Sequence, residues 1–386
     1  MLTGVWGETA LESATNVVYT CTLRHVTPLR QVGAHNRSVA DDDPGTKGGL
    51  PMSEDTGRPT MHDVARVAGV SHATVSRVLN GHTNVAPATA RAVADAIITT
   101  GYVPNRAARS LRVQSTDTVV LVARENVNVF YTEPTLSPMA SGANLRLSEH
   151  GYQMLLALVD DPRSAERVGS LIAGGSFDAA ILVAMTNEDP LVARLMATNI
   201  PLVTASTPFP GSDIPSADTD NVGGARAITE RLVATGRSKV VAIGGPSWAP
   251  VTPLRLDGFH RGARNAALGH TTVDGWTLTA GERAMSELLQ RYPDLDGVVA
   301  ASDLLATGAI RVLNEAGRRV PQDVGVVGFD DAPAATLSDP PLSTVRSDAR
   351  ATGAALADMV VAQIRGQELP QRHLVIPNEV LWRESA

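Results

Sequence analysis

The chain has 386 residues, a formal net charge of −7 and a hydrophobic content of 43%. This length exceeds one small domain, so we expect two or three folding units. There is no run of about eighteen apolar residues, which excludes a transmembrane helix and predicts no membrane partner. The single cysteine, Cys21, excludes an intramolecular disulfide framework and fits a reducing cytoplasm. No Cys/His cluster has the spacing of a zinc site.

Residues 1–57 show no clear periodicity, and the polar, turn-rich stretch 40–57 predicts a disordered extension. Met52 lies a few residues before the first periodic segment. One hypothesis is that translation starts at Met52, and the alternative is a genuine additional tail with a regulatory role. The intact mass of the natively expressed protein distinguishes the two.

The segment 58–103 is expected to form three short helices. Thr60 can cap the first helix and Gly69 can end it, while Ser71 caps the second helix and Pro87 opens the third. Two helices joined by a short turn around a glycine form the helix-turn-helix geometry, whose second helix enters the major groove of DNA.

Charge is distributed unevenly along the chain. From residue 58 to residue 113 there are seven Arg, no Lys and two Asp, a net charge of +5, which leaves −12 for the rest. A basic module on an acidic body is typical of a nucleic-acid binder, and arginine suits bidentate recognition of phosphate or guanine. The alternative interpretation is a generic three-helix bundle with a solvated charged face.

The sequence is more specific than the helical spacing. DVARVAGVSHATVSRVLNG (63–81), followed by GYVPNRAARSL (101–111), closely resembles the DNA-binding headpiece and hinge of the LacI/GalR (lac-repressor) family. The resemblance implies a helix-turn-helix DNA-binding domain over 58–103 and a hinge helix with its linker over 104–116.

The same resemblance implies roles for individual residues. It assigns base reading to His72, Ala73 and Arg77. It assigns phosphate contacts to Ser71, Thr74 and Ser76, and DNA-backbone contacts or turn positions to Asn80 and Asn84. The hinge residues that would enter the minor groove of the operator are Asn105, Ala108 and Leu111. Without the resemblance, Leu111 would be interpreted as an ordinary apolar linker residue.

From residue 117 onward, short apolar runs alternate with amphipathic segments. The expected strands are 118–123, 153–159, 179–185, 201–206, 239–245, 297–302 and 324–330. The expected helices are 136–150, 163–173, 191–197, 222–235, 256–267, 282–291, 304–316 and 349–365. This alternation predicts an α/β body of two doubly wound parallel-sheet halves over 117–386. A ligand is expected in the cleft that faces the carboxyl ends of the strands.

The sequence lacks the motifs of common enzyme classes. The glycine pair that ends the strand at 239–245 does not continue as G-x-G-x-x-G, and no G-x-S-x-G, Walker A or H-E-x-x-H sequence occurs. The acidic pairs at 160–161 and 330–331 are interpreted as strand-end turns or solvated loops. We therefore expect neither an enzyme nor a bound cofactor.

The body also resembles the effector domain of the LacI/GalR family, which is similar to periplasmic sugar-binding proteins. The matching segments include RLDGFH (255–260), ASDLLATGAIRVLNEAGRRVPQDVGVVGFDD (301–331) and PPLSTVR (340–346). The resemblance places Arg255 and Asp303 at the centre of the effector site and Trp276 against the apolar face of the ligand. A guanidinium and a carboxylate can bind the vicinal hydroxyls of a sugar.

Each of these assignments has an alternative. Arg255 would otherwise be a surface residue, Trp276 a core residue, and Asp303 a support for the N-terminus of its helix. Phe130 is expected on the other lip of the cleft, in a stretch that departs from the usual pattern of the family.

These features predict a sequence-specific DNA-binding transcriptional regulator, a repressor of carbohydrate uptake or catabolism genes. Its operator affinity would change when a small-molecule effector, expected to be a sugar, alters the closure of the two halves. One reading helix per chain predicts a homodimer on a pseudo-palindromic double-stranded operator. Release and recruitment of DNA by the effector are both allowed. The alternative function is a cytoplasmic sugar-binding protein without operator specificity, and an enzyme is the third.

Overall fold

The computed structural model describes residues 59–79, 84–103, 115–125, 134–186, 188–205 and 212–386. The chain divides into two compact units, Met1–Tyr102 and Val103–Ala386. Several predictions lie outside the described residues: the extension over 1–57 and the roles of Asn80, Asn105, Ala108, Leu111 and Phe130.

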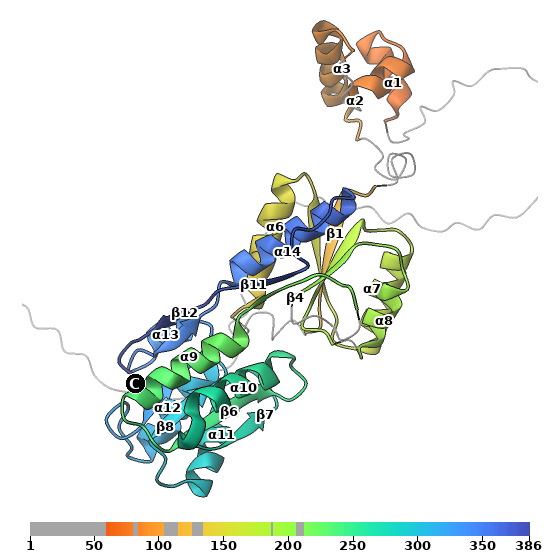
Figure 1. Cartoon of the computed structure of the whole chain (residues 1–386). Helices are drawn as coiled ribbons and strands as arrows, with labels where there is room; N and C mark the ends of the chain where they lie inside the picture. The colour runs from red at the N-terminus through yellow and green to blue at the C-terminus, as the bar shows by residue number, and fades with distance from the viewer. Residues whose placement is uncertain (1–58, 80–83, 104–114, 126–133, 187, 206–211) are drawn as a thin grey trace, which may run out of the picture. The chain divides into compact units, whose positions relative to one another are not determined.

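The first unit is a bundle of α1 (Met61–Ala68), α2 (His72–Leu79) and α3 (Pro87–Thr100), shown in Figure 1. The Thr60 hydroxyl accepts a hydrogen bond from the N–H of Asp63, whose carboxylate accepts one from the N–H of Thr60, and this confirms the expected cap of α1. Gly69 ends α1 with a φ of 65°, a left-handed conformation that glycine adopts at low cost. The buried core consists of Val64, Ala65, Val75, Val93 and Ala96.

The second unit has two lobes. The described part of the N-lobe sheet has six parallel strands in the order β11-β5-β4-β3-β1-β2. Their bounds are β1 Thr118–Ala123, β2 Gln153–Leu158, β3 Ala179–Val183, β4 Leu202–Ala205, β5 Ser216–Thr219 and β11 His373–Ile376. The helices of this lobe are α6 (Leu136–Glu149), α7 (Pro162–Ala173), α8 (Pro190–Met196) and α14 (Ala349–Ile364).

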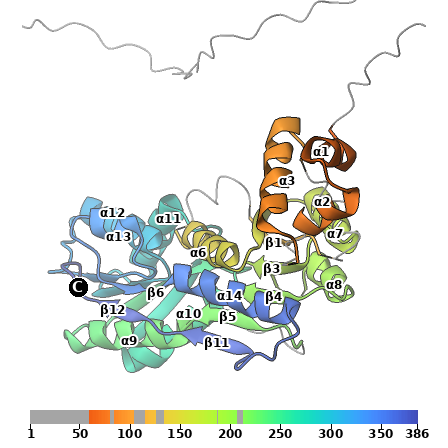
Figure 2. The same cartoon turned by 90° about the horizontal axis from the view of Figure 1, so that it is seen from above.

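Successive residues of a strand point to opposite faces of a sheet. In β1, Leu121 enters the core shared with α6 and α14, while Val120 enters the core shared with α7 and α8. Figures 1 and 2 both show α6 and α14 side by side on one face. Burial on both faces explains why these strands read as continuous apolar runs in the sequence.

The C-lobe is built in the same way, with a described parallel sheet in the order β7-β6-β8-β9. Its strands are β6 (Val240–Pro246), β7 (Ala267–Val273), β8 (Gly297–Ala300) and β9 (Gly325–Val327). Its helices are α9 (Asn221–Ala234), α10 (Val251–Ala263), α11 (Leu278–Arg291), α12 (Asp303–Glu315) and α13 (Pro333–Leu337). A short antiparallel pair, β10 (Thr344–Arg346) with β12 (Glu379–Leu381), completes the lobe.

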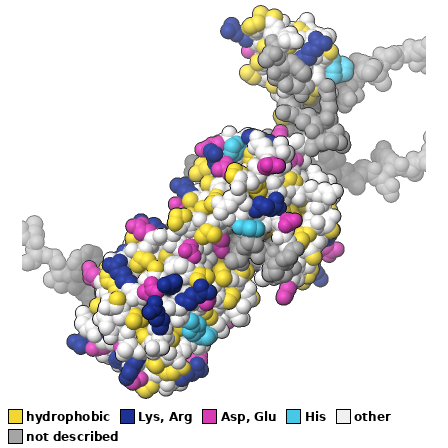
Figure 3. All heavy atoms as spheres, viewed as in Figure 1, with side chains coloured by type: hydrophobic (Ala, Val, Ile, Leu, Met, Phe, Trp, Pro, Cys, Tyr) yellow, Lys and Arg dark blue, Asp and Glu magenta, His cyan; other side chains and the backbone are white. Residues whose placement is uncertain are grey.

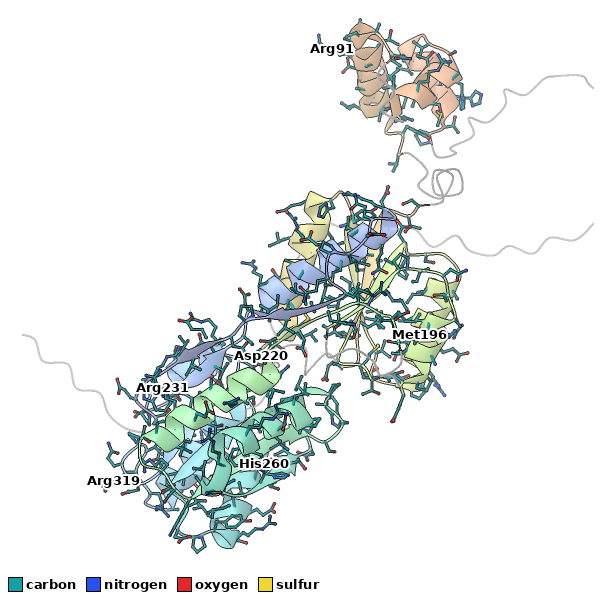
Figure 4. The ribbon with its side chains drawn as sticks, viewed as in Figure 1. Arg91, Met196, Asp220, Arg231, His260 and Arg319 are labelled. Atoms are coloured by element: carbon teal, nitrogen blue, oxygen red, sulfur yellow. The ribbon has the colours of Figure 1, made fainter. Side chains whose placement is uncertain are left out.

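Between the lobes the described chain crosses from β5 to α9, from β10 to α14 and from β11 to β12. Figure 4 labels Asp220 at the first of these crossings, immediately before α9. The Asn378 amide, from the third crossing, donates to the carbonyl oxygen of Asp220 at 2.6 Å, and its oxygen accepts from the Thr219 hydroxyl. These bonds tie two crossings together at one point.

The predicted fold class is confirmed, and all seven predicted strands form. The sequence prediction was wrong where it left β5, β7, β10, β11, β12 and α13 unassigned. These elements are short or lie at sheet edges, so they are only partly apolar and lack a long buried run. The prediction also continued α10 through Ala267, which instead begins β7, and started it five residues too late.

Candidate effector site and nucleic-acid interface

A pocket lies between the two lobes, where β3, β4 and β5 of the N-lobe end. It is called the inter-lobe pocket here, and its lining includes Glu125, Asp218, Asn221, Arg255, Trp276 and Asp330. The carboxyl ends of parallel strands leave such a crevice because the connections diverge above and below the sheet. The position is the one expected from the alternating strands and helices.

Arg255, on α10, is fixed by hydrogen bonds and by a contact with an aromatic ring. Its Nη2 donates to Asp330 Oδ1 at 3.0 Å, its Nε donates to Asn221 Oδ1 at 2.9 Å, and its Nη1 donates to the carbonyl oxygen of Ala301 at 2.5 Å. The guanidinium carbon also lies 3.8 Å from the centre of the Phe329 ring. Arg255 is 8% exposed, so it is not the surface residue of the alternative interpretation.

Asp330 is the carboxylate that faces Arg255 in this pocket. Its side chain is 5% exposed and also accepts a hydrogen bond from the Ser347 hydroxyl at 3.3 Å. The acidic pair at 330–331 follows β9, as the interpretation as strand-end turns predicted, but the alternative of a solvated loop is wrong for the buried Asp330. Asp330 and Asp331 have φ values of 102° and 56°, unusual for residues other than glycine. Backbone strain of this kind persists where surrounding contacts fix it, often at functional sites.

Asp303 lies beside the inter-lobe pocket but is not among its lining residues, and its place at the centre of the effector site stays a prediction. It is completely buried in the first turn of α12, and its carboxylate accepts from the N–H of Ala332 at 2.7 Å and from the Thr344 hydroxyl at 2.6 Å. These bonds fix the segment that follows Asp330. Asp303 and Asp330 each follow a strand, and these two strands, β8 and β9, lie side by side in the sheet. The sequence therefore did not show which of the two carboxylates faces Arg255.

Asp218, at the end of β5, is the second carboxylate that sequence reasoning missed. Its oxygens accept from the N–H of Thr219 at 2.8 Å and from the Asn221 amide at 3.2 Å. Burial raises the pKa of Asp218 to about 6, although these hydrogen bonds and the charge of Arg255 act in the opposite direction. Asn221 therefore bridges Arg255 and Asp218 across the lobe boundary.

Trp276 lines the pocket, and it also packs against the core under α11 and α12. Its ring lies directly over Gly245 of β6: a Cβ atom there would stand 2.0 Å from the ring and 2.7 Å from the Thr252 hydroxyl. The glycine pair that ends β6 thus makes room for an aromatic side chain. Trp248 lies in the same lining and is 48% exposed.

In the first unit, α2 presents a polar face. His72, Ala73 and Arg77 are exposed, whereas Val75 of the same helix is completely buried. The exposed Ser71 hydroxyl accepts from the N–H of Thr74 at 3.2 Å and shares a hydrogen bond with its hydroxyl. Ser71 therefore caps α2, and its predicted phosphate contact would add to that role. Ser76 is half-buried and Asn84 is exposed.

His62 of α1 was not singled out by the sequence prediction. Its ring lies 4.7 Å from the ring of His72, with an angle of 35° between the two planes. The two exposed rings are thus in contact between α1 and the first residue of α2. No sequence motif indicates the contact between His62 and His72, because it depends on how α1 and α2 pack together.

Among the residues that the structure describes, no helix is both long enough and apolar enough to pass through a bilayer. The same residues contain no group of three or more His, Cys, Asp or Glu side chains placed to hold a metal ion.

Comparisons with known proteins agree with both units. Residues 60–105 match the family described as bacterial regulatory proteins, lacI family, and residues 229–386 match the periplasmic binding protein-like domain. The transcriptional regulator CelR of Thermobifida fusca is 39% identical over 334 residues, which are 85% of this chain and 98% of that protein. The chain belongs to the LacI family of bacterial regulatory proteins.

Other LacI-family members are also similar over nearly their whole length. The regulator MalR of Streptomyces coelicolor is 33% identical, with 84% of this chain and 96% of that protein covered. The ribose operon repressor of Escherichia coli is 29% identical, with 85% and 99% covered. The chain is thus a sequence-specific DNA-binding transcriptional regulator whose second unit takes a small-molecule effector.

Solved LacI-family structures share the fold. A complex of the regulator CelR with cellobiose is 37% identical with a TM-score of 0.67, and 85% of this chain and all of that chain are covered. A lac repressor dimer bound to its operator is 26% identical with a TM-score of 0.75, and 85% of this chain and 99% of that chain are covered.

Proposed function

We propose that this chain is a cytoplasmic repressor of carbohydrate uptake or catabolism genes that binds a pseudo-palindromic operator as a homodimer. A glycoside in the inter-lobe pocket changes its affinity for that operator. The observation that carries the proposal is the buried constellation of Arg255, Asp330 and Asn221 beside Trp276. Fixed polar groups beside an aromatic wall are the arrangement that binds a sugar, whose hydroxyls are polar and whose ring faces are apolar. We propose no catalytic role for any residue.

The similarity to known regulators supports the choice of effector. The relative solved with cellobiose matches all of its own length. We therefore propose a disaccharide effector for this chain. Closure of the two lobes around the sugar would move the crossings that Asn378 ties together, and a ligand shifts such an equilibrium by its differential affinity for the two states.

The first test is a selection of genomic DNA fragments by the full chain, followed by fluorescence anisotropy with and without cellobiose, maltose and lactose. We expect an enriched inverted repeat and a sugar-dependent change in its affinity. Recovery of no inverted repeat would favour the alternative of a sugar-binding protein without operator specificity.

Base reading is tested separately. Arg77→Ala should cost roughly 1–3 kcal/mol and relax the preference at one base per half-site, because a bidentate contact with a base edge is lost. The matched control is Arg91→Ala, which removes the same charge from an exposed position on α3. Equal weakening of Arg77→Ala on every DNA sequence would show that Arg77 contacts the phosphate backbone only.

A further inference from the structure

The inter-lobe pocket has an excess of acid. Among its described lining residues, the carboxylates of Glu125, Asp218 and Asp330 accompany a single basic side chain, that of Arg255. On the face of the C-lobe drawn in Figure 3, basic and acidic side chains are interspersed. Within the described lining of the pocket, acidic side chains therefore outnumber basic ones.

The guanidinium of Arg255 is already paired with groups of the protein itself. A guanidinium has five N–H donors. Four of them are directed at Asn221 Oδ1, at the carbonyl oxygen of Ala301, and at both oxygens of Asp330, at 3.0 and 3.4 Å. A phosphate or carboxylate on the ligand would have to displace Asp330, whose own charge would then lie buried and unpaired.

The carboxylate of Asp218 has no such pairing with a guanidinium among the hydrogen bonds of the described residues. Asp218 accepts from the N–H of Thr219 and from the amide of Asn221, which are both uncharged donors. Burial raises its pKa to about 6, so Asp218 is largely ionised at neutral pH. An ionised carboxylate accepts hydrogen bonds from hydroxyl groups and repels an anion.

Two segments that follow lining residues in the sequence contain no basic side chain. Residues 126–133 (NVNVFYTE) and 206–211 (STPFPG) contain no Lys, Arg or His in the sequence. Arg124, just before the first of these segments, is paired with Asp189, its Nε donating at 2.7 Å. Neither of these two sequence segments thus contains a basic residue, and Arg124 is already paired.

We infer that the pocket selects an uncharged glycoside, which donates its hydroxyls to Asp218, and excludes phosphorylated or carboxylated sugars. This inference rests on the proposed function, since it names the chemical class of the effector in the same site. Selection of this kind uses repulsion of the wrong ligand as well as attraction of the right one.

The experiment compares each neutral disaccharide with its own anion. The full chain is titrated calorimetrically with cellobiose, maltose and lactose, and with the same three sugars carrying a carboxylate in place of one C6 hydroxymethyl group. We expect one neutral sugar to bind and its carboxylated form to bind about 100-fold more weakly or worse, because an unmatched like charge costs several kcal/mol.

Two outcomes would count against these proposals, and each contradicts a different one. A carboxylated sugar that binds as tightly as its neutral form overturns the inference but leaves the proposed function standing. Failure of all six sugars to bind contradicts the proposed disaccharide effector itself.

A variant isolates the contribution of Asp218. Asp218→Asn keeps the shape and removes the charge, so the affinity ratio of the neutral to the carboxylated sugar should fall by about 10-fold or more, because one repelling charge is lost. Asp213→Asn is the matched control, since Asp213 is exposed, lies in the same lobe and does not line the pocket. A ratio that stays the same in Asp218→Asn, or falls equally in Asp213→Asn, overturns the role of Asp218.

Discussion

Asn221 Oδ1 accepts a hydrogen bond from Arg255 Nε at 2.9 Å. The amide nitrogen of the same side chain donates to Asp218 Oδ2 at 3.2 Å. Asn221 is the first residue of α9 and is 2% exposed, so it stands at the crossing where the chain leaves the N-lobe. One buried side chain thus connects a C-lobe cation with an N-lobe carboxylate.

We expect Asn221→Ala to weaken effector binding by roughly 10-fold to 100-fold, because a lost hydrogen bond to a charged group costs about 1.5–3 kcal/mol. Calorimetric titration of the neutral sugar measures the loss. Asn314→Ala, at an exposed position on α12, is the matched control and should bind as the unaltered chain does. Normal affinity in Asn221→Ala would show that Arg255 is fixed without it.

Arg255→Met should destabilise the second unit by about 3–5 kcal/mol, since it leaves Asp330 buried without its partner. Urea unfolding measures this change. The double variant Arg255→Met/Asp330→Asn should recover most of the stability but not the response of operator binding to sugar. A double variant that regains the response would remove the ion pair from the effector site.

Gly245→Ala should lower effector affinity by displacing the ring of Trp276, because the added Cβ would stand 2.0 Å from the ring. Tryptophan fluorescence and calorimetric titration report the two effects together. Gly275→Ala is the matched control: its Cβ would meet its nearest neighbour, the Thr277 side chain, at 3.9 Å. If Gly245→Ala binds sugar normally, Trp276 is not part of the binding wall.

Stability should depend on pH through Asp303. Burial, together with the nearby Asp330 carboxylate, raises the pKa of Asp303 to about 8. Because the folded pKa exceeds the unfolded value, the stability contribution is fully present below the unfolded pKa, declines as the pH rises, and is lost above about pH 8. The thermal midpoint of the unaltered chain should therefore fall more steeply than that of Asp303→Asn between about pH 5 and pH 8. Parallel profiles would contradict the raised pKa.

Much of the fold was predictable because it rests on local patterns. The capping residues Thr60 and Gly69, the helix-turn-helix spacing and the two-sided burial of β1 all leave a signal within a few residues. The edge strand β7 left little signal, because one partly exposed strand does not require a continuous apolar run.

The sequence alone determined the two units, the alternation of strands and helices, the exposed face of α2 and the participation of Arg255 and Trp276 in one pocket. Only the tertiary structure decided that Asp330, and not Asp303, faces Arg255, and that Asp218 and Asn221 join them from the other side of a lobe crossing. The physical reason is that the contacts join residues that lie far apart in the sequence. Arg255 is 34 residues from Asn221 and 75 residues from Asp330. Their partners are set by which parallel strands end beside one another, and sequence spacing does not encode that order.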